Sequence, residues 1–152
     1  MMSRRRRRAA SDVDEYQGTP GTLSRKQVQD AIRRRTSLQN ADIRGLDLSG
    51  LNFDGMDLSL AKLAETNLSS CSFRNANLSG ASMWCANLQD AVLDGALLDN
   101  ADLDLANLDG VTVKGARLKK TILPFAKLPM DTVRTAIKTG ARLRMEPGEL
   151  ES

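Results

Sequence analysis

The sequence contains no histidine, two cysteines and few aromatic residues, and each shortage excludes a class of function. Without histidine the chain cannot form a Ser-His-Asp triad, a Cys-His pair or a histidine-rich zinc site. Two cysteines cannot supply a disulfide framework or a four-cysteine metal cage. Aromatic residues make up 3% of the chain, so aliphatic side chains must fill its core. We therefore expect no catalytic residues, no metal site and no cofactor.

Long apolar runs are also absent. No stretch approaches the 18 apolar residues that a membrane-spanning helix requires. The arginines near the N-terminus are followed by no apolar segment, so no secretory signal is visible and we expect a cytoplasmic location. With 152 residues, of which 41% are hydrophobic and 27% charged, the chain has the size and composition of one folded domain.

The net charge of +3 is unevenly distributed along the chain. Residues 1–35 carry ten Lys and Arg against four Asp and Glu, whereas residues 36–130 carry eight against eleven. We expect residues 1–23 to form a disordered basic arm. The arm could contact nucleic acid, an anionic membrane or an acidic protein, or serve only as a solubilising tail. Its basic character comes from five consecutive arginines: Arg4, Arg5, Arg6, Arg7 and Arg8.

A five-residue repeat runs without interruption from residue 36 to residue 130. The third position of each block is Leu, Ile, Phe, Met or Val; the first is most often Ala, the second often Asp or Asn, and the fifth often Gly. Positions one and three place two apolar side chains on one face of a short strand, and positions four and five carry turn residues. Repetition of strand and corner winds the chain around an axis that the third-position side chains fill.

The blocks resemble the pentapeptide-repeat family, whose motif is A-(D/N)-L-X-X; the matching blocks include ADIRG, ANLSG, ANLQD, ADLDL and ANLDG. The resemblance implies an all-β fold, a right-handed quadrilateral β-helix with four blocks per coil and nearly five coils. Residues twenty apart should then lie about 4.8 Å from each other. We expect Phe53 to stack on Phe73, and the core to include Leu68, Leu88 and Leu108.

The N-terminal end of the β-helix needs a cap, because an open solenoid exposes backbone groups and core side chains. Ser24 and Gln27 form a capping-box pattern, which predicts a short helix over residues 24–35. Its apolar residues are spaced to form one narrow face for the first coil: Val28, Ala31 and Ile32.

A second cap is expected at the C-terminal end, where residues 131–152 should form a capping helix and a tail. Asp131 is the expected N-cap of a helix that ends before Gly140. Pro124 and Pro129 lie in the last two blocks, and a residue without an N–H is expected to stop the winding there. The expected apolar face of the helix consists of Val133, Ala136 and Ile137.

An acidic belt is expected in one twenty-residue stretch that contains no Lys or Arg. One interpretation is an imitation of DNA, since some members of the family that protect DNA gyrase are acidic rods. The alternative is a solvated face, paired with the basic residues of the next coil. A third interpretation, calcium binding, requires carboxylates that converge, and these point to different sides. The belt consists of Asp90, Asp94, Asp99, Asp102, Asp104 and Asp109.

An apolar column is expected on one corner of the β-helix. Trp84 occupies a fourth position, and Cys85, Leu105 and Phe125 occupy fifth positions twenty residues apart, where Gly, Asn and Ser are usual. An exposed apolar column on a solenoid indicates a contact surface. The alternative is that residues 140–152 cover it.

The sequence therefore predicts a non-enzymatic protein-binding, scaffold or structural module. A DNA-mimicking protein that protects or inhibits a topoisomerase is the alternative. A solenoid filled with its own side chains leaves no cavity for a small-molecule substrate. The expected partner is another protein or a second copy of the chain, contacted through the apolar column and the arginines.

Overall fold

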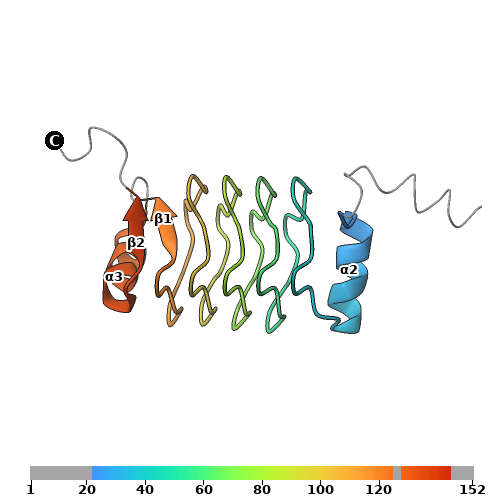
Figure 1. Cartoon of the computed structure of the whole chain (residues 1–152), viewed down its shortest axis with the longest axis horizontal. Coiled ribbons are helices and arrows are strands. Elements are labelled where there is room, and N and C mark those ends of the chain that lie inside the picture. The colour runs from blue at the N-terminus through green and yellow to red at the C-terminus, as the bar shows by residue number, and fades with distance from the viewer. Residues whose placement is uncertain (1–21, 125–127, 145–152) are drawn as a thin grey trace, which may run out of the picture.

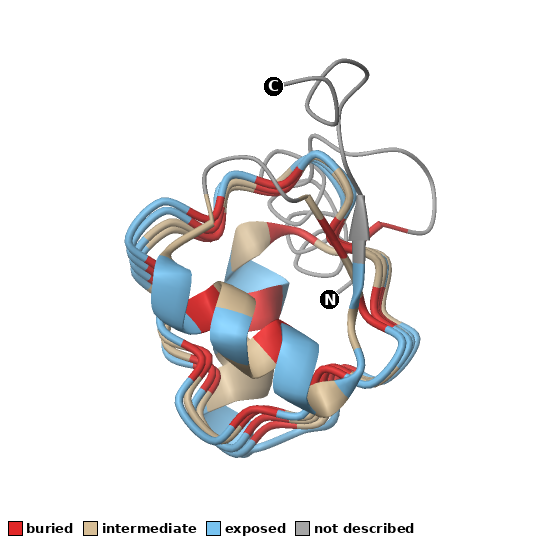
Figure 2. Ribbon diagram, turned by 90° about the vertical axis from the view of Figure 1, so that its left-hand side faces the viewer, coloured by how far each residue is buried: buried red, intermediate tan, exposed pale blue. Residues whose placement is uncertain are grey.

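The computed structural model describes residues 22–124 and 128–144 as a rod of stacked coils with a helix at each end (Figure 1). Between the helix α2 (Arg25–Arg34) and the strand β1 (Ile122–Pro124), the chain makes a turn after every short side. The helix α3 (Met130–Thr139) and the strand β2 (Arg142–Arg144) follow. Along the rod axis the coils superimpose in a four-sided outline with exposed corners (Figure 2).

A ladder of parallel bridges holds the coils together. The bridges join residues twenty apart, from Asp42–Lys62 to Asp102–Ile122, so one coil takes four blocks. On each side the third-position N–H donates to the next coil, as Leu88 does to the carbonyl of Asn107 at 2.8 Å. Each side pairs through one second-position residue before the chain turns. For this reason the described residues contain only two regular strands, β1 and β2, although the hydrogen bonding is that of a sheet.

The core is one continuous column of aliphatic side chains. Every third-position residue from Leu38 to Leu123 is buried, and so is every first-position residue from Met56 to Thr121. This includes the three core leucines named above: Leu68, Leu88 and Leu108. Phe53 and Phe73 stack with their ring centroids 5.0 Å apart and their planes 5° from parallel, as a twenty-residue coil requires.

The frequent Asp or Asn at the second position shapes the corner that follows it. Its side chain accepts a hydrogen bond from the fourth-position N–H, as Asp47 does from Ser49 and Asn87 from Gln89, each at 3.1 Å. The fifth-position residue then turns the chain with a positive φ, which is +70° at Gly95. Glycine adopts this backbone without strain, which explains its frequency at the corners.

The N-terminal helix α2 lies across the first coil. Ser24 is its N-cap, and the capping box with Gln27 forms in both directions, with distances of 3.2 and 2.7 Å. Val28 is completely buried, and Ala31 and Ile32 are partly buried against the core. One narrow face of α2 therefore covers the end of the core.

Two arginines complete the cap at the N-terminal edge of the ladder. The first coil has no coil before it, so its second- and fourth-position carbonyls lack the N–H groups that a preceding coil gives to later ones. The N–H of Leu23 serves the carbonyl of Asp42, at 2.8 Å. The guanidinium of Arg25 donates to the carbonyls of Asp47 and Ser49 at 2.6 and 3.4 Å. Arg35 donates to the carbonyl of Asp54 at 2.8 Å. These side chains cover an edge that would otherwise be open to another strand.

The expectation that Pro124 stops the winding was wrong. β1 pairs in parallel with β2, with Ile122 opposite Arg142, so the twenty-residue spacing continues although α3 replaces part of the coil. Residues 142–144, expected in a tail, therefore belong to the ladder. Pro124 occupies a fourth position, whose N–H bonds to a side chain and not to the ladder in earlier coils. The side chain of Ile122, two residues before, has no acceptor atom for a fourth-position N–H, so proline breaks no bond of that kind at this corner.

The helix α3 begins before the expected position. Its N-cap is Pro129, without a side-chain hydrogen bond, and Asp131 lies within the first turn. The φ of −58° at Pro129 leads the chain directly into the helix. Asp131 is therefore not the N-cap, but its negative charge still lies near the positive end of the helix dipole. The helix ends as expected at Gly140, whose φ is +82°.

The inward face of α3 also differs from the expected one. Ile137, expected to face the core, is 69% exposed, while Thr132 and Ala136 are buried. Val133 is only partly buried. Small side chains meet the last coil, and the bulkier ones lie on the solvent side of the helix.

We predict that Leu88→Ala lowers the free energy of unfolding by about 2–5 kcal/mol, because it leaves a cavity in a closely packed column. Leu105→Ala is the matched control, since it removes the same atoms from a side chain that is half exposed. Its expected cost is below about 0.5 kcal/mol. Urea unfolding of both variants measures the difference, and equal losses would contradict this account of the core.

Candidate binding surfaces

Trp84, Cys85 and Leu105 lie together on one corner of the rod, and we call them the corner strip. The N–H of Cys85 donates to the carbonyl of Asp104 at 3.0 Å, which places Leu105 in the adjacent coil directly beside Cys85. Trp84 is 40% exposed and Leu105 is 52% exposed, while Cys85 is half-buried. Phe125, the expected fourth member, lies outside the described residues.

The backbone of the corner strip is unfavourable for the residues that it carries. Cys85 has a φ of +57° and Leu105 a φ of +60°, both in the left-handed region. That region costs a residue with a Cβ roughly 1–2 kcal/mol, and glycine or asparagine would avoid much of the cost. Local backbone preference therefore does not explain the apolar side chains at this corner. Such positions are often functional.

Carboxylates border the corner strip in the neighbouring coils. Glu65 belongs to the preceding coil and Asp104 to the following one, and burial together with these two charges raises the pKa of the Cys85 thiol. The Cys71 thiol is buried and donates to the carbonyl of Leu48 at 3.0 Å, and burial raises its pKa to about 11. Both cysteines are free thiols. Raised pKa values make both poor nucleophiles at neutral pH.

Leu60 is an exposed apolar residue that the sequence interpretation missed. It is 54% exposed and has a φ of +59° at a neighbouring corner. Its Cδ2 atom lies 2.7 Å from the place that a Cβ on Gly80 would occupy, so it rests on the glycine of the next coil. A search for apolar columns passes over Leu60, because the column continues with glycine. A search for single apolar residues at fifth positions would find it.

The acidic belt encircles the rod. Asp94, Asp99, Asp104 and Asp109 occupy the fourth positions of four successive blocks, so one aspartate lies at each corner of a coil. Asp90 occupies a fifth position and is exposed. The six carboxylates therefore do not form a line along one face, as the phosphates of a DNA strand do.

Two aspartates of the belt support the backbone of the next coil. Asp94 accepts a hydrogen bond from the N–H of Lys114 at 3.0 Å, and Asp99 from the N–H of Lys119 at 3.3 Å. At both corners the second-position residue is neither Asp nor Asn, so the carboxylate of the preceding coil takes its place. Asp99 also forms an ion pair with Arg117 at 2.8 Å.

A third aspartate of the belt stabilises its own corner, because Asp102 accepts from the N–H of Asp104 at 2.9 Å. Half of the aspartates in the belt thus stabilise the fold itself.

Within the part of the chain that the structure describes, no three His, Cys, Asp or Glu side chains lie close enough to hold a metal ion.

The arginines from Arg4 to Arg8 lie outside the described residues, so the structure does not place them relative to the corner strip. Across residues 22–124 and 128–144, no helix has the length and apolar character needed to cross a bilayer.

Comparison with known proteins gives matches over the repeats. The family model for pentapeptide repeats matches residues 57–93 and 86–123, with eight copies. The structure of alr5209, a pentapeptide repeat protein from Nostoc PCC 7120, is 29% identical over 84% of this chain and 100% of that chain, with a TM-score of 0.56. A pentapeptide repeat protein from the Arabidopsis thaliana thylakoid lumen is 28% identical over 66% of this chain and 80% of that chain, with a TM-score of 0.46.

A more distant match is QnrB1, a plasmid-mediated fluoroquinolone resistance protein. It is 16% identical over 74% of this chain and 81% of that chain, with a TM-score of 0.32, and this likeness concerns the fold alone. No curated protein matches the chain.

We predict that Asp94→Ala lowers the free energy of unfolding by about 1 kcal/mol, because the N–H of Lys114 loses its acceptor. Asp109→Ala is the matched control. It removes the same group from the same position, but the residue twenty positions later in the sequence is Pro129, the N-cap of α3, which has no N–H to donate. Its expected cost is below about 0.5 kcal/mol. Urea unfolding compares the two, and a control as damaging as Asp94→Ala would refute the structural role of the belt.

Proposed function

The chain belongs to the pentapeptide-repeat family, and from this premise we propose that it is a non-enzymatic rod that binds a protein partner through the corner strip. Proteins of this family form right-handed quadrilateral β-helices, and the right-handed sense of winding is part of the proposal. The observation that carries the proposal is the exposure of Trp84 and Leu105 together on one corner, where Leu105 has a left-handed backbone. Tryptophan in particular is enriched among residues that dominate binding energy.

The surroundings of the corner strip define the chemistry of the partner. The strip offers an apolar centre, with Glu65 in the coil before Cys85 and Asp104 next to Leu105. A complementary surface has an apolar pocket for Trp84 with Lys or Arg at its rim. Either another protein or a second copy of this chain could present such a surface. The rigid ladder beneath the strip favours binding, because the contact residues need little ordering.

We predict that Trp84→Ser combined with Leu105→Ser abolishes association that the unaltered chain shows in sedimentation or in a pull-down. A loss of 2 kcal/mol or more, as expected at an interface hot spot, weakens binding by about 30-fold. Leu60→Ser is the matched control, since it also removes a half-exposed apolar side chain from a corner with a positive φ. Association that survives in the double variant, or that Leu60→Ser weakens equally, would rule out the corner strip.

The basic arm is a second part of the proposal. Five consecutive arginines favour an acidic protein, nucleic acid or an anionic membrane through charge, with a strong dependence on salt. A pull-down with and without residues 1–21 tests whether the arginines contribute to holding the partner.

The cytoplasmic location expected from the sequence also stays a prediction.

A DNA-mimicking role toward gyrase is the alternative function. The acidic belt motivates it, but the aspartates surround the rod and three of them bond to backbone N–H groups. The body of the rod also carries basic residues in the coil that follows the belt. A supercoiling assay with purified gyrase decides between the two functions. We expect no effect at micromolar protein, and inhibition or protection there would favour the alternative.

A further inference from the structure

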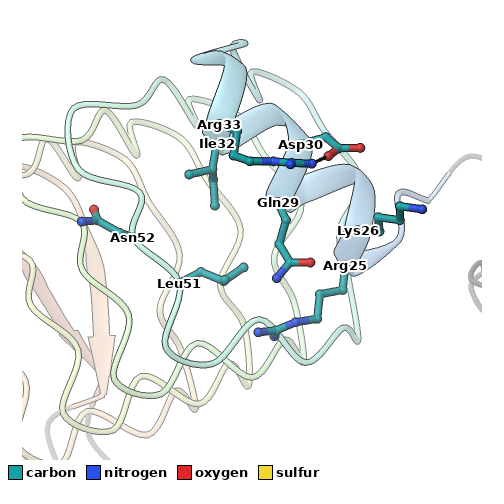
Figure 3. Close-up of a pocket in the computed structure, with 8 residues that line it drawn as sticks. All are labelled: Arg25, Lys26, Gln29, Asp30, Ile32, Arg33, Leu51 and Asn52. Carbon is teal, nitrogen blue, oxygen red and sulfur yellow. Dashed lines mark hydrogen bonds and ion pairs between the residues drawn. The ribbon is translucent and has the colours of Figure 1, made fainter.

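A groove of about 810 Å³ lies between α2 and the first coil, with side chains of the helix on one side and Leu51 and Asn52 on the other (Figure 3). Ile32 and Leu51 supply apolar surface within it. Gln29 and Asn52 add amide groups that can donate and accept hydrogen bonds. The lining thus combines an apolar floor with hydrogen-bonding groups, which suits a short peptide.

The groove is also positively charged. Arg25, Lys26 and Arg33 line it, against a single carboxylate, Asp30, which pairs with Arg33. The guanidinium of Arg25 is fixed in place by its bonds to the carbonyls of the first coil. An occupant that fits this lining carries apolar side chains between acidic ones.

One segment of this chain has that pattern and lies close to the groove in sequence. Residues 12–16 read DVDEY, so three carboxylates accompany Val13 and Tyr16. The segment lies outside the described residues and ends six residues before Thr22, where the description begins. Six residues span up to about 20 Å when extended, and the ten residues of α2 are about 15 Å long. The segment can therefore reach along the whole helix.

We propose that the groove beside α2 binds the chain's own segment Asp12–Tyr16. Val13 and Tyr16 pack on Ile32 and Leu51, and the carboxylates face the cations of the groove. A short tether gives the segment an effective concentration in the millimolar range, so modest contacts suffice to hold it. This interaction does not depend on the corner strip. It would anchor the arginine run at the N-terminal end of the rod, and an acidic partner peptide would compete for the same groove.

The experiment measures cleavage by a glutamate-specific protease after Glu15 in the full chain. The rate is normalised to that of a free peptide with the same sequence, since cleavage follows the population of the open form. If about nine-tenths of the molecules are docked, cleavage is about tenfold slower in the chain than in the peptide. Lys26→Gln with Arg33→Gln should remove most of this protection, and so should 0.5 M salt.

The matched control is Arg134→Gln with Lys138→Gln, which removes the same charges from α3 at the opposite end of the rod (Figure 1). We expect it to leave the protection unchanged. A second test variant, Asp12→Asn with Asp14→Asn, alters no described residue and should remove the protection without any effect on the fold. It is compared with a free peptide carrying the same two changes.

Several results would overturn the proposal. Cleavage as fast in the chain as in the peptide shows that the segment does not dock. If both test variants keep the slow cleavage after Glu15, another contact protects this bond. Residues 145–152 are also acidic, with three Glu, so slow cleavage after Glu15 that becomes fast only when they are deleted would assign the protection to a contact with those residues. Protection that rises with protein concentration would assign the groove to a second copy.

Discussion

The structure depends on one constraint, which is that every twenty residues the chain must return to the same place above the previous coil. The ladder of hydrogen bonds connects only residues with this separation, and the third-position side chains fill the axis only if the register holds. A single inserted residue within a side would move apolar side chains outward and break the bonds to both neighbouring coils. This constraint explains why the nineteen blocks follow one another without an insertion.

The same constraint limits the positions at which residues can be chosen for binding and not for stability. The sides of the coil are committed to the ladder and the core, so only the corners and the two ends can vary. Many corners carry residues that help the turn, such as glycine or a carboxylate that accepts a backbone N–H. The corner strip and Leu60 do not, and they keep exposed apolar surface at a backbone cost. In the sequence the acidic belt resembles a binding surface, but three of its six aspartates accept hydrogen bonds from backbone N–H groups at the corners.

The sequence was sufficient wherever the repeat or a local capping motif decides the structure. The twenty-residue coil, the stacked rings of Phe53 and Phe73, and the Ser24 cap follow from spacing and residue type. The C-terminal end was harder, because Pro124 breaks a rule for ordinary strands but not for a position whose N–H is outside the ladder. The roles of Arg25 and Arg35 could not be predicted, since a carbonyl without a donor becomes visible only when the first coil is built. The repeat spacing places Cys85 and Leu105 at one corner, but how far their side chains are exposed is known only from the structure.

The most direct test of the twenty-residue coil is disulfide formation between Cys85 and a cysteine introduced by Leu105→Cys. Residues at equivalent positions of adjacent coils lie about 4.8 Å apart, within the range of Cα separations that a disulfide spans. The coil predicts that mild oxidation of the folded chain links Cys85 to the new cysteine, as shown by mass spectrometry after proteolysis. Asn100→Cys and Gly110→Cys place the thiol one corner away on either side, and neither should form a bond with Cys85. A bond in either of these controls, or none in the first variant, would contradict the coil.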